Sequence, residues 1–265
     1  MTKGYADIPE GQVSYRTEGS EQPILLLHQT PWSFKEYSLM IPILAKSYRV
    51  IAMETLGYGY SDDPPREYAV EDYARSVISF LDALHITKTS IVGHHTGSTI
   101  AAEVAAAYPE RVDKLIVSGL SCWEPKEWEQ LLIELPSEME PPAEDGSRLI
   151  DLWNMTKSYA VQPKMELLLK RFIVNLDSYT KTYDAHHALA RYNVKPRLPL
   201  IKCPTLAISG SKDLFIDDLE TIKGAIPLCQ TMVIEGTGGA ICLEKPEEFA
   251  SAILEFLGNP SDAPL

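Results

Sequence analysis

The sequence predicts a mostly parallel α/β sheet flanked by helices, interrupted by one inserted helical segment. Short apolar runs alternate with amphipathic stretches in the first 120 residues and again from residue 198, and this alternation is typical of a parallel sheet covered on both faces. Residues 121–197 instead read as helical and proline-interrupted, and they contain three of the four tryptophans. We therefore expect a core formed by residues 1–120 and 198–265, and a helical lid formed by residues 121–197.

The individual elements follow from local patterns. Runs rich in Val, Ile and Leu, bounded by turn residues, predict strands. Apolar residues at helical spacing, such as Tyr73, Val77, Phe80 and Leu84, predict helices. We expect the strands at residues 23–28, 48–53, 90–93, 115–117, 205–209 and 231–235, and the helices at residues 34–48, 70–86, 98–108, 218–226 and 246–257.

The composition excludes several classes of protein. The 265 residues include 37 acidic and 24 basic side chains, a net charge of −13, whereas nucleic-acid binding needs a basic surface. No apolar run approaches the roughly 18 residues of a membrane span, and the N-terminus lacks the apolar segment of a signal peptide. The four cysteines match no zinc spacing. We expect a cytoplasmic protein with reduced thiols and without nucleic-acid or membrane partners, as a monomer or a homodimer.

The turn after the strand at residues 90–93 carries the chemistry. It reads Gly93-His94-His95-Thr96-Gly97, and the G-x-X-x-G spacing is that of a nucleophile elbow, a sharp strand-to-helix turn that needs small residues at both ends. The turn presents its middle side chain, His95, at the carboxyl edge of the sheet, where open α/β folds bind ligands.

With this turn in place, the sequence resembles the α/β-hydrolase superfamily over nearly its whole length. The resemblance rests on several segments in their common order, of which each alone is weak. They are His28-Gln29-Thr30-Pro31, residues 54–62, the Tyr-Pro-Glu-Arg-Val segment at 108–112, Gly210-Ser211-Lys212-Asp213 and residues 236–246. The resemblance implies an α/β-hydrolase fold with an inserted helical lid and, as a prior, hydrolysis of a small molecule without a cofactor.

Three departures from the family pattern fall in the chemistry. His95 stands where the family has Ser, Cys or Asp, Gly239 aligns with the catalytic histidine, and Gln29 replaces the glycine of the oxyanion loop. The family acid is retained as Asp213. A Ser-His-Asp triad needs a nucleophile beside an oriented base, so covalent serine catalysis is not expected here.

Two of the departures complement each other. The glycine at 239 leaves space into which His95 can extend toward Asp213, and a carboxylate would orient the imidazole as a general base. Backbone N–H groups of Gln29, Thr30 and Thr96 would form the oxyanion hole, with the Thr96 side chain pointing elsewhere. Such a site supports hydrolysis of an ester, lactone or C–C bond, or a lyase or decarboxylase reaction. The alternatives are a catalytically silent ligand-binding member and a chain altered at His95 or Gly239.

The substrate pocket is expected between the elbow and the lid. The residues expected to line it are His28, Trp32, His94, Trp123, Trp153, His186 and Gly239. We expect no metal and no cofactor, because no carboxylate completes a ligand pattern around the histidines.

The lid is charged unevenly. Residues 124–151 hold nine acidic and two basic side chains, and residues 157–197 hold eight basic and three acidic ones. Either the two halves attract each other, or the basic half, with Lys157, Lys164 and Arg171, draws in a carboxylate substrate.

Overall fold

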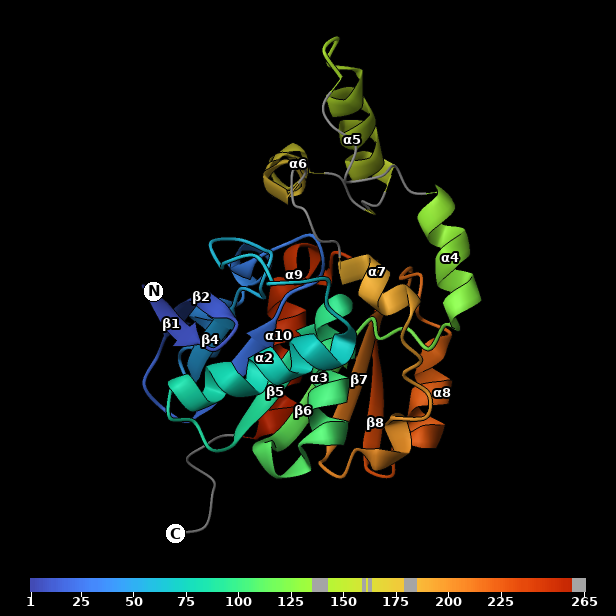
Figure 1. The fold of residues 1–265 in the computed structure, drawn as a ribbon. Helices are drawn as coiled ribbons and strands as arrows, with labels where there is room; N and C mark the ends of the chain where they lie inside the picture. The colour runs from blue at the N-terminus through green and yellow to red at the C-terminus, as the bar shows by residue number, and fades with distance from the viewer. Residues whose placement is uncertain (135–142, 159–160, 162–163, 179–184, 259–265) are drawn as a thin grey trace.

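The computed structural model describes residues 1–134, 143–158, 161, 164–178 and 185–258 (Figure 1). The described strands form one eight-stranded sheet in the order β1-β2-β4-β3-β5-β6-β7-β8. From β4 to β8 all neighbours are parallel, so the predicted mostly parallel α/β sheet is confirmed. These strands are β3 (Pro23–Leu27), β4 (Arg49–Met53), β5 (Thr89–His94), β6 (Val112–Ser118), β7 (Thr205–Gly210) and β8 (Cys229–Ile234).

An antiparallel hairpin at the sheet edge was not expected from the sequence. Strands β1 (Thr2–Ile8) and β2 (Gly11–Glu18) pair antiparallel with each other, and β2 pairs antiparallel with β4. Only Ala6 and Ile8 of β1 are buried, so this strand has no continuous apolar run by which sequence alone would reveal it.

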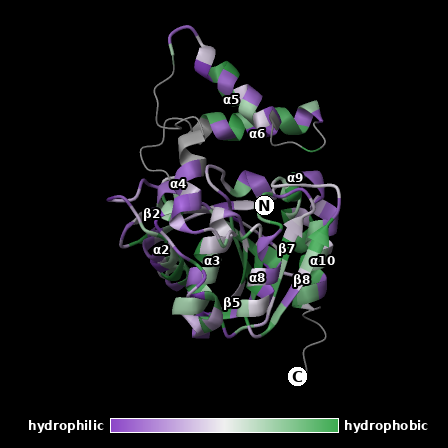
Figure 2. Ribbon diagram, turned by 90° about the vertical axis from the view of Figure 1, so that its right-hand side faces the viewer, coloured by the Kyte–Doolittle hydropathy of each residue, from purple (hydrophilic) through white to green (hydrophobic). Residues whose placement is uncertain are grey.

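Helices cover both faces of the sheet because successive strand residues point to opposite sides. In β3, Leu25 and Leu27 pack on the face covered by α2 and α3, whereas Ile24 and Leu26 pack on the face covered by α1 and α10. Figure 2 shows the apolar residues gathered in the sheet and on the inner helix faces. The core helices are η1 (Phe34–Tyr37), α1 (Ile41–Leu44), α2 (Val70–Ala83), α3 (Thr96–Ala107), η2 (Pro109–Arg111), η3 (Leu198–Leu200), α8 (Asp218–Ala225), α9 (Ile241–Glu244) and α10 (Pro246–Leu257).

The described part of the insertion between β6 and β7, at the carboxyl ends of the parallel strands, contains four helices. They are α4 (Pro125–Glu134), α5 (Ser147–Ser158), α6 (Met165–Ser178) and α7 (Ala185–Ala190). In Figure 1, α5 and α6 stand away from the sheet, and α7 lies close to the core. Where the chain returns to the core, Glu103 of α3 binds Arg197 at 2.7 Å and the Tyr192 hydroxyl at 2.6 Å.

Among the described residues, every helix is too short or too polar to span a lipid bilayer.

Candidate functional site

The elbow forms where β5 passes into α3. His95 lies between them with φ 46° and ψ −111°, a conformation that L-residues rarely adopt and that stores strain at functional turns. Gly97 is required on the inner side, because a Cβ there would lie 2.1 Å from the Leu27 carbonyl oxygen. The turn therefore presents the His95 side chain at the carboxyl edge of the sheet.

The approach of His95 to Asp213, expected from the sequence, is present in the structure. The His95 Nε2 lies 3.0 Å from Asp213 Oδ2, and the Phe215 N–H donates to Oδ1 at 3.0 Å. The carboxylate, which is almost fully buried, is thus fixed by its own loop after β7. A carboxylate only accepts hydrogen bonds, so the neutral imidazole carries its proton on Nε2 and its lone pair on Nδ1.

Two glycines make room for the imidazole. A Cβ on Gly239 would lie 3.2 Å from His95 Cε1, and a Cβ on Gly119 would lie 2.6 Å from His95 Cδ2. Gly119 follows β6 directly and has φ +61°, a conformation that also favours glycine. Only Gly239 was expected from the sequence, and the tighter of the two contacts is made by Gly119.

The electrostatics of the pair follow from burial and charge. Burial lowers the pKa of His95, but the adjacent Asp213, its hydrogen bond and the Glu36 carboxyl raise it more, so the pKa lies above its usual value of 6.5. Burial raises the pKa of Asp213, but the His95 charge and hydrogen bond dominate and lower it to about 2. Asp213 is therefore ionised throughout the neutral range, and its charge favours the protonated form of the His95 imidazole.

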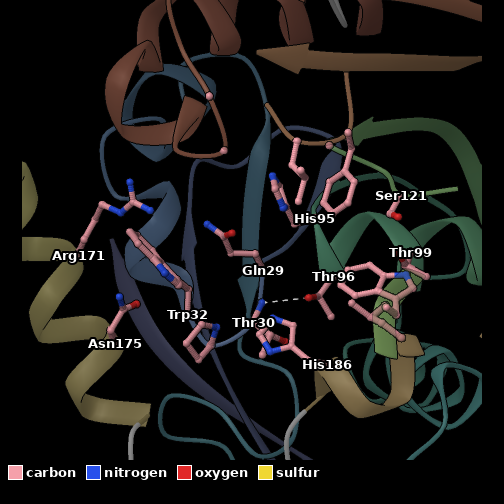
Figure 3. Close-up of a pocket in the computed structure, with 18 of the residues that line it drawn as sticks. Gln29, Thr30, Trp32, His95, Thr96, Thr99, Ser121, Arg171, Asn175 and His186 are labelled. Atoms are coloured by element: carbon pink, nitrogen blue, oxygen red, sulfur yellow. Dashed lines mark hydrogen bonds between the residues drawn. The ribbon is translucent and has the colours of Figure 1, made fainter. Parts of the chain in front are cut away.

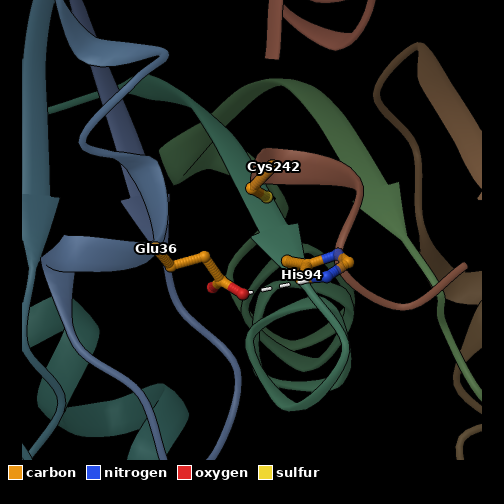
Figure 4. A group of neighbouring side chains, drawn as sticks. All are labelled: Glu36, His94 and Cys242. Carbon is orange, nitrogen blue, oxygen red and sulfur yellow. Dashed lines mark ion pairs between the residues drawn. The ribbon is translucent and has the colours of Figure 1, made fainter. Parts of the chain in front are cut away.

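A second, fully buried group of polar side chains lies behind the elbow (Figure 4). Glu36, His94 and Cys242 have ligand atoms within 4.8 Å of one another, close enough to hold a metal ion. Each of the first two already has protein partners. Both Glu36 oxygens accept hydrogen bonds from Gln29, and His94 Nε2 lies 3.2 Å from the Gly239 carbonyl oxygen. The absence of a metal stays a prediction.

Burial sets the protonation of this inner group. Burial, reinforced by the charge of His95, lowers the pKa of His94 to about 3, so this imidazole is neutral near pH 7. Because a carbonyl oxygen only accepts hydrogen bonds, the His94 Nε2–H donates to the Gly239 carbonyl. The unprotonated Nδ1 then accepts a hydrogen bond from the Ser118 hydroxyl at 3.0 Å. Burial raises the pKa of Glu36 to about 7 despite the opposing hydrogen bonds from Gln29.

The site opens into a cavity of about 430 Å³ between the sheet edge and the inserted helices (Figure 3). Of the residues expected there, Trp32, His186 and Gly239 line it, together with His95 and Thr96. This volume suits a small organic molecule.

Four residues expected at the cavity lie elsewhere. The His28 ring binds the Gln29 carbonyl and the Thr55 N–H, so it braces the loop from behind. His94 belongs to the buried inner group. Trp123 packs on Phe215 and Trp128, and Trp153 packs on Phe172. These side chains pack against other residues or hold the loop in place. Their closeness to the motifs in the sequence does not show this, because it does not fix the direction in which a side chain points.

Arg171, one of the three basic residues considered for attracting a carboxylate, lines the cavity, whereas Lys157 and Lys164 are not among its lining residues. Asn175 was not expected there. Arg171 and Asn175 project from α6 toward Trp32 in Figure 3, and their spacing of four residues puts them on one helix face. That spacing from Arg171 is the sequence signal that could have pointed to Asn175. The other cavity residues not expected are Pro31, Thr99, Gly119, Ser121, Trp128, Met155, Val161, Leu189, Lys212, Leu214, Phe215 and Gly238.

The expected oxyanion donors are arranged differently from the expectation. The Gln29 N–H donates to Glu36 Oε2 at 2.9 Å, and the Thr30 N–H donates to Thr96 Oγ1 at 3.2 Å. Both N–H groups of the loop are therefore already hydrogen-bonded. The Thr96 side chain, expected to point away, lines the cavity. Within the part of the chain that the structure describes, the Thr96 N–H has no acceptor.

The comparison with protein families agrees with this architecture. A family model described as the alpha/beta hydrolase fold matches residues 22–246. The chain therefore belongs to the alpha/beta hydrolase fold family.

Among characterised relatives, the chain is 27% identical to the 2-hydroxy-6-oxo-6-(2'-aminophenyl)hexa-2,4-dienoic acid hydrolase of Metapseudomonas resinovorans, over 95% of this chain and 89% of that protein. It is 26% identical to a 2-hydroxy-6-oxononadienedioate/2-hydroxy-6-oxononatrienedioate hydrolase of Paraburkholderia xenovorans, over 82% and 79%. The solved enol-lactonase of Burkholderia xenovorans has the same fold, with a TM-score of 0.81, 20% identity and coverage of 96% and 99%. These relatives are hydrolases of small molecules.

Proposed function

We propose that this protein is a cofactor-free hydrolase of a small carbonyl compound that carries a carboxylate, with His95 as general base and Asp213 as its orienting acid. The observation that carries the proposal is the 3.0 Å contact between His95 Nε2 and Asp213 Oδ2 beside the cavity. It supplies an oriented base with a raised pKa where a small molecule would bind.

The reaction needs no covalent enzyme intermediate. His95 Nδ1 takes a proton from water, the water oxygen bonds to the substrate carbonyl carbon, and the carbonyl electron pair moves onto its oxygen. When this intermediate collapses, the C–C or C–O bond breaks and the leaving group takes the proton back from the imidazolium. Asp213 stabilises the imidazolium in between, which is the role of a carboxylate paired with a base.

The experiment that tests the proposal is turnover of 2-hydroxy-6-oxo-6-(2'-aminophenyl)hexa-2,4-dienoic acid, the compound named for one relative, between pH 5 and 9. The neutral imidazole is the active form, so kcat/KM should be low where His95 is protonated. It should rise with pH, with an apparent pKa above 6.5. Water labelled with ¹⁸O should place one label in the carboxylic acid product.

Two results would contradict the proposal. Thermal stabilisation by the compound without turnover at any pH would identify a catalytically silent binding protein. Turnover without ¹⁸O in the product would identify a lyase reaction instead of hydrolysis.

We propose that the carboxylate of the substrate binds on the α6 side of the cavity. Arg171 is buried there to 9% exposure, and its guanidinium carbon lies 5.9 Å from the centre of the Trp32 ring. Asn175 lies one helical turn further on and lines the same cavity. A guanidinium can bind a carboxylate through two parallel hydrogen bonds, and the overall charge of −13 makes a local cation valuable for attracting an anion.

Arg171→Gln should raise KM for the dienoate about 10- to 100-fold, because a hydrogen bond to a charged group contributes about 1.5 to 3 kcal/mol, with a smaller change in kcat. Steady-state kinetics of the variant measure both. The matched control is Lys170→Gln, since Lys170 is 49% exposed and pairs with Glu166 on the outer face of the same helix. Equal KM values for the Arg171→Gln variant and the wild type would remove Arg171 from the site.

A further inference from the structure

The two backbone donors of the oxyanion loop are both engaged inside the protein. Gln29 binds Glu36 through both its side chain and its backbone. The side-chain Nε2 donates to Glu36 Oε1 at 2.6 Å, and the backbone N–H donates to Glu36 Oε2 at 2.9 Å. The Glu36 carboxyl is buried to 1% exposure, so moving Gln29 N–H toward a substrate would leave a buried acceptor unsatisfied.

The remaining loop donor ends on a hydroxyl that faces the cavity. The Thr30 N–H donates to Thr96 Oγ1, drawn as the dashed line in Figure 3. A hydroxyl has one proton and two lone pairs. By accepting from Thr30, Thr96 keeps its own O–H to donate, and among the described residues no acceptor takes that proton.

Thr96 therefore offers two donors from one residue. It is the first residue of α3, so its N–H has no partner within the helix and lies at the positive end of the helix dipole. A hydroxyl that accepts one hydrogen bond becomes a stronger donor through polarisation, so the Thr30 N–H acts on a bound oxygen through Oγ1. His95, the neighbouring residue, supplies the base.

We infer that the Thr96 side-chain hydroxyl, together with the Thr96 N–H, is the oxyanion donor of this site, replacing the N–H groups of the Gln29–Thr30 loop. The inference rests on the proposed function and names the group that holds the carbonyl oxygen while water adds to the carbon. The negative oxygen accepts both hydrogen bonds from Thr96 and loses them when the carbonyl re-forms.

Substitution of Thr96 distinguishes the two arrangements because valine has the same shape without the hydroxyl. Thr96→Val frees the Thr30 N–H. If the loop N–H binds the substrate oxygen, the variant keeps or increases kcat; if the hydroxyl binds it, kcat falls about 10²- to 10³-fold, the usual effect of losing one oxyanion donor. Thr96→Ser retains the hydroxyl and should stay within about tenfold of the wild type on the same scale.

The control is Thr89→Val, at the opposite end of β5. Thr89 is equally buried, and its hydroxyl donates to the Pro23 carbonyl far from the cavity, so its loss should leave kcat unchanged. Thermal unfolding of all three variants separates misfolding from loss of chemistry. His95→Gln is measured in parallel with the same dienoate. Full activity of Thr96→Val alone would overturn this inference, whereas full activity of His95→Gln would overturn the proposed function.

Discussion

Replacing His95 by glutamine is expected to lower kcat/KM for the dienoate by about 10²- to 10⁴-fold, the contribution of a positioned general base. Glutamine can still hydrogen-bond Asp213 but cannot accept a proton from water. The exposed imidazole of His187, next to the cavity residue His186 on α7, provides the control: His187→Gln should keep the wild-type rate. If His95→Gln retains more than a tenth of the wild-type kcat/KM, His95 is not the base.

The partner substitution Asp213→Asn tests the orientation of the same imidazole. Asp213 raises the pKa of His95 both by its charge and by its hydrogen bond, so Asp213→Asn should lower that pKa. The part of the pH–rate profile in which kcat/KM rises with pH should therefore move to lower pH. Glu36, His94 and His186 also lie in the electrostatic surroundings of this imidazole. If the rise of kcat/KM with pH moves to lower pH in Asp213→Asn, the rise reports titration of the His95–Asp213 pair. An unchanged profile would assign the rise to another group.

The nitrogen spectrum of His95 provides a readout independent of turnover. In the wild type, Asp213 holds the proton on Nε2, so Nδ1 carries the lone pair. ¹⁵N chemical shifts of the neutral ring should show this tautomer in the wild type and its loss in Asp213→Asn. Protonation on Nδ1 in the wild type would contradict the assigned geometry.

The second large effect is expected at Gly119. In Gly119→Ala the new Cβ would lie 2.6 Å from His95 Cδ2 and 2.7 Å from Nε2, distances that real Cβ contacts do not reach. The imidazole must move, so its hydrogen bond to Asp213 should break and kcat/KM should fall by at least about 10²-fold. Alanine at φ +61° adds backbone strain of about 1 to 2 kcal/mol.

Matched glycines separate the two causes. Gly236→Ala carries a comparable strain, at φ +75°, with nothing within 4 Å of the new Cβ, so it should lower the melting temperature and leave kcat/KM nearly unchanged. Gly239→Ala places its Cβ 3.2 Å from His95 Cε1, a contact that small shifts can relieve, and should fall between the two in activity. Equal activities of Gly119→Ala and Gly236→Ala would show that the imidazole does not need this space.

Much of the site follows from local sequence signals. The spacing of Gly93 and Gly97 identifies the elbow, and the position of Asp213 after a buried strand puts a carboxylate at the same sheet edge. Substitution of an imidazole at one motif position and a glycine at another predicts the contact between His95 and Asp213. These signals are readable because all parallel strands of the fold end at the same edge of the sheet, and the strands before His95 and Asp213, β5 and β7, are separated only by β6.

The cavity walls could not be predicted in the same way. Trp128 and Asn175 come from helices whose packing on the core depends on non-local contacts. The charge pattern offered Arg171 only as one of two interpretations, because a basic side chain on such a helix can equally face solvent. The role of Gly119 is also hard to predict from the sequence. A side chain at this position is excluded only because the His95 ring lies against it in the folded protein.

The sequence by itself determined the parallel α/β core and the position of the elbow, and it predicted that Asp213 lies beside His95, because strand periodicity and turn glycines are local properties of the chain. Only the tertiary structure decided which donors face the cavity. The loop N–H groups of Gln29 and Thr30 are consumed by Glu36 and Thr96, residues that the chain brings to them from 7 and 66 positions away. The hydrogen-bond partner of a backbone N–H outside regular structure is set by such packing and is not encoded in the neighbouring residues.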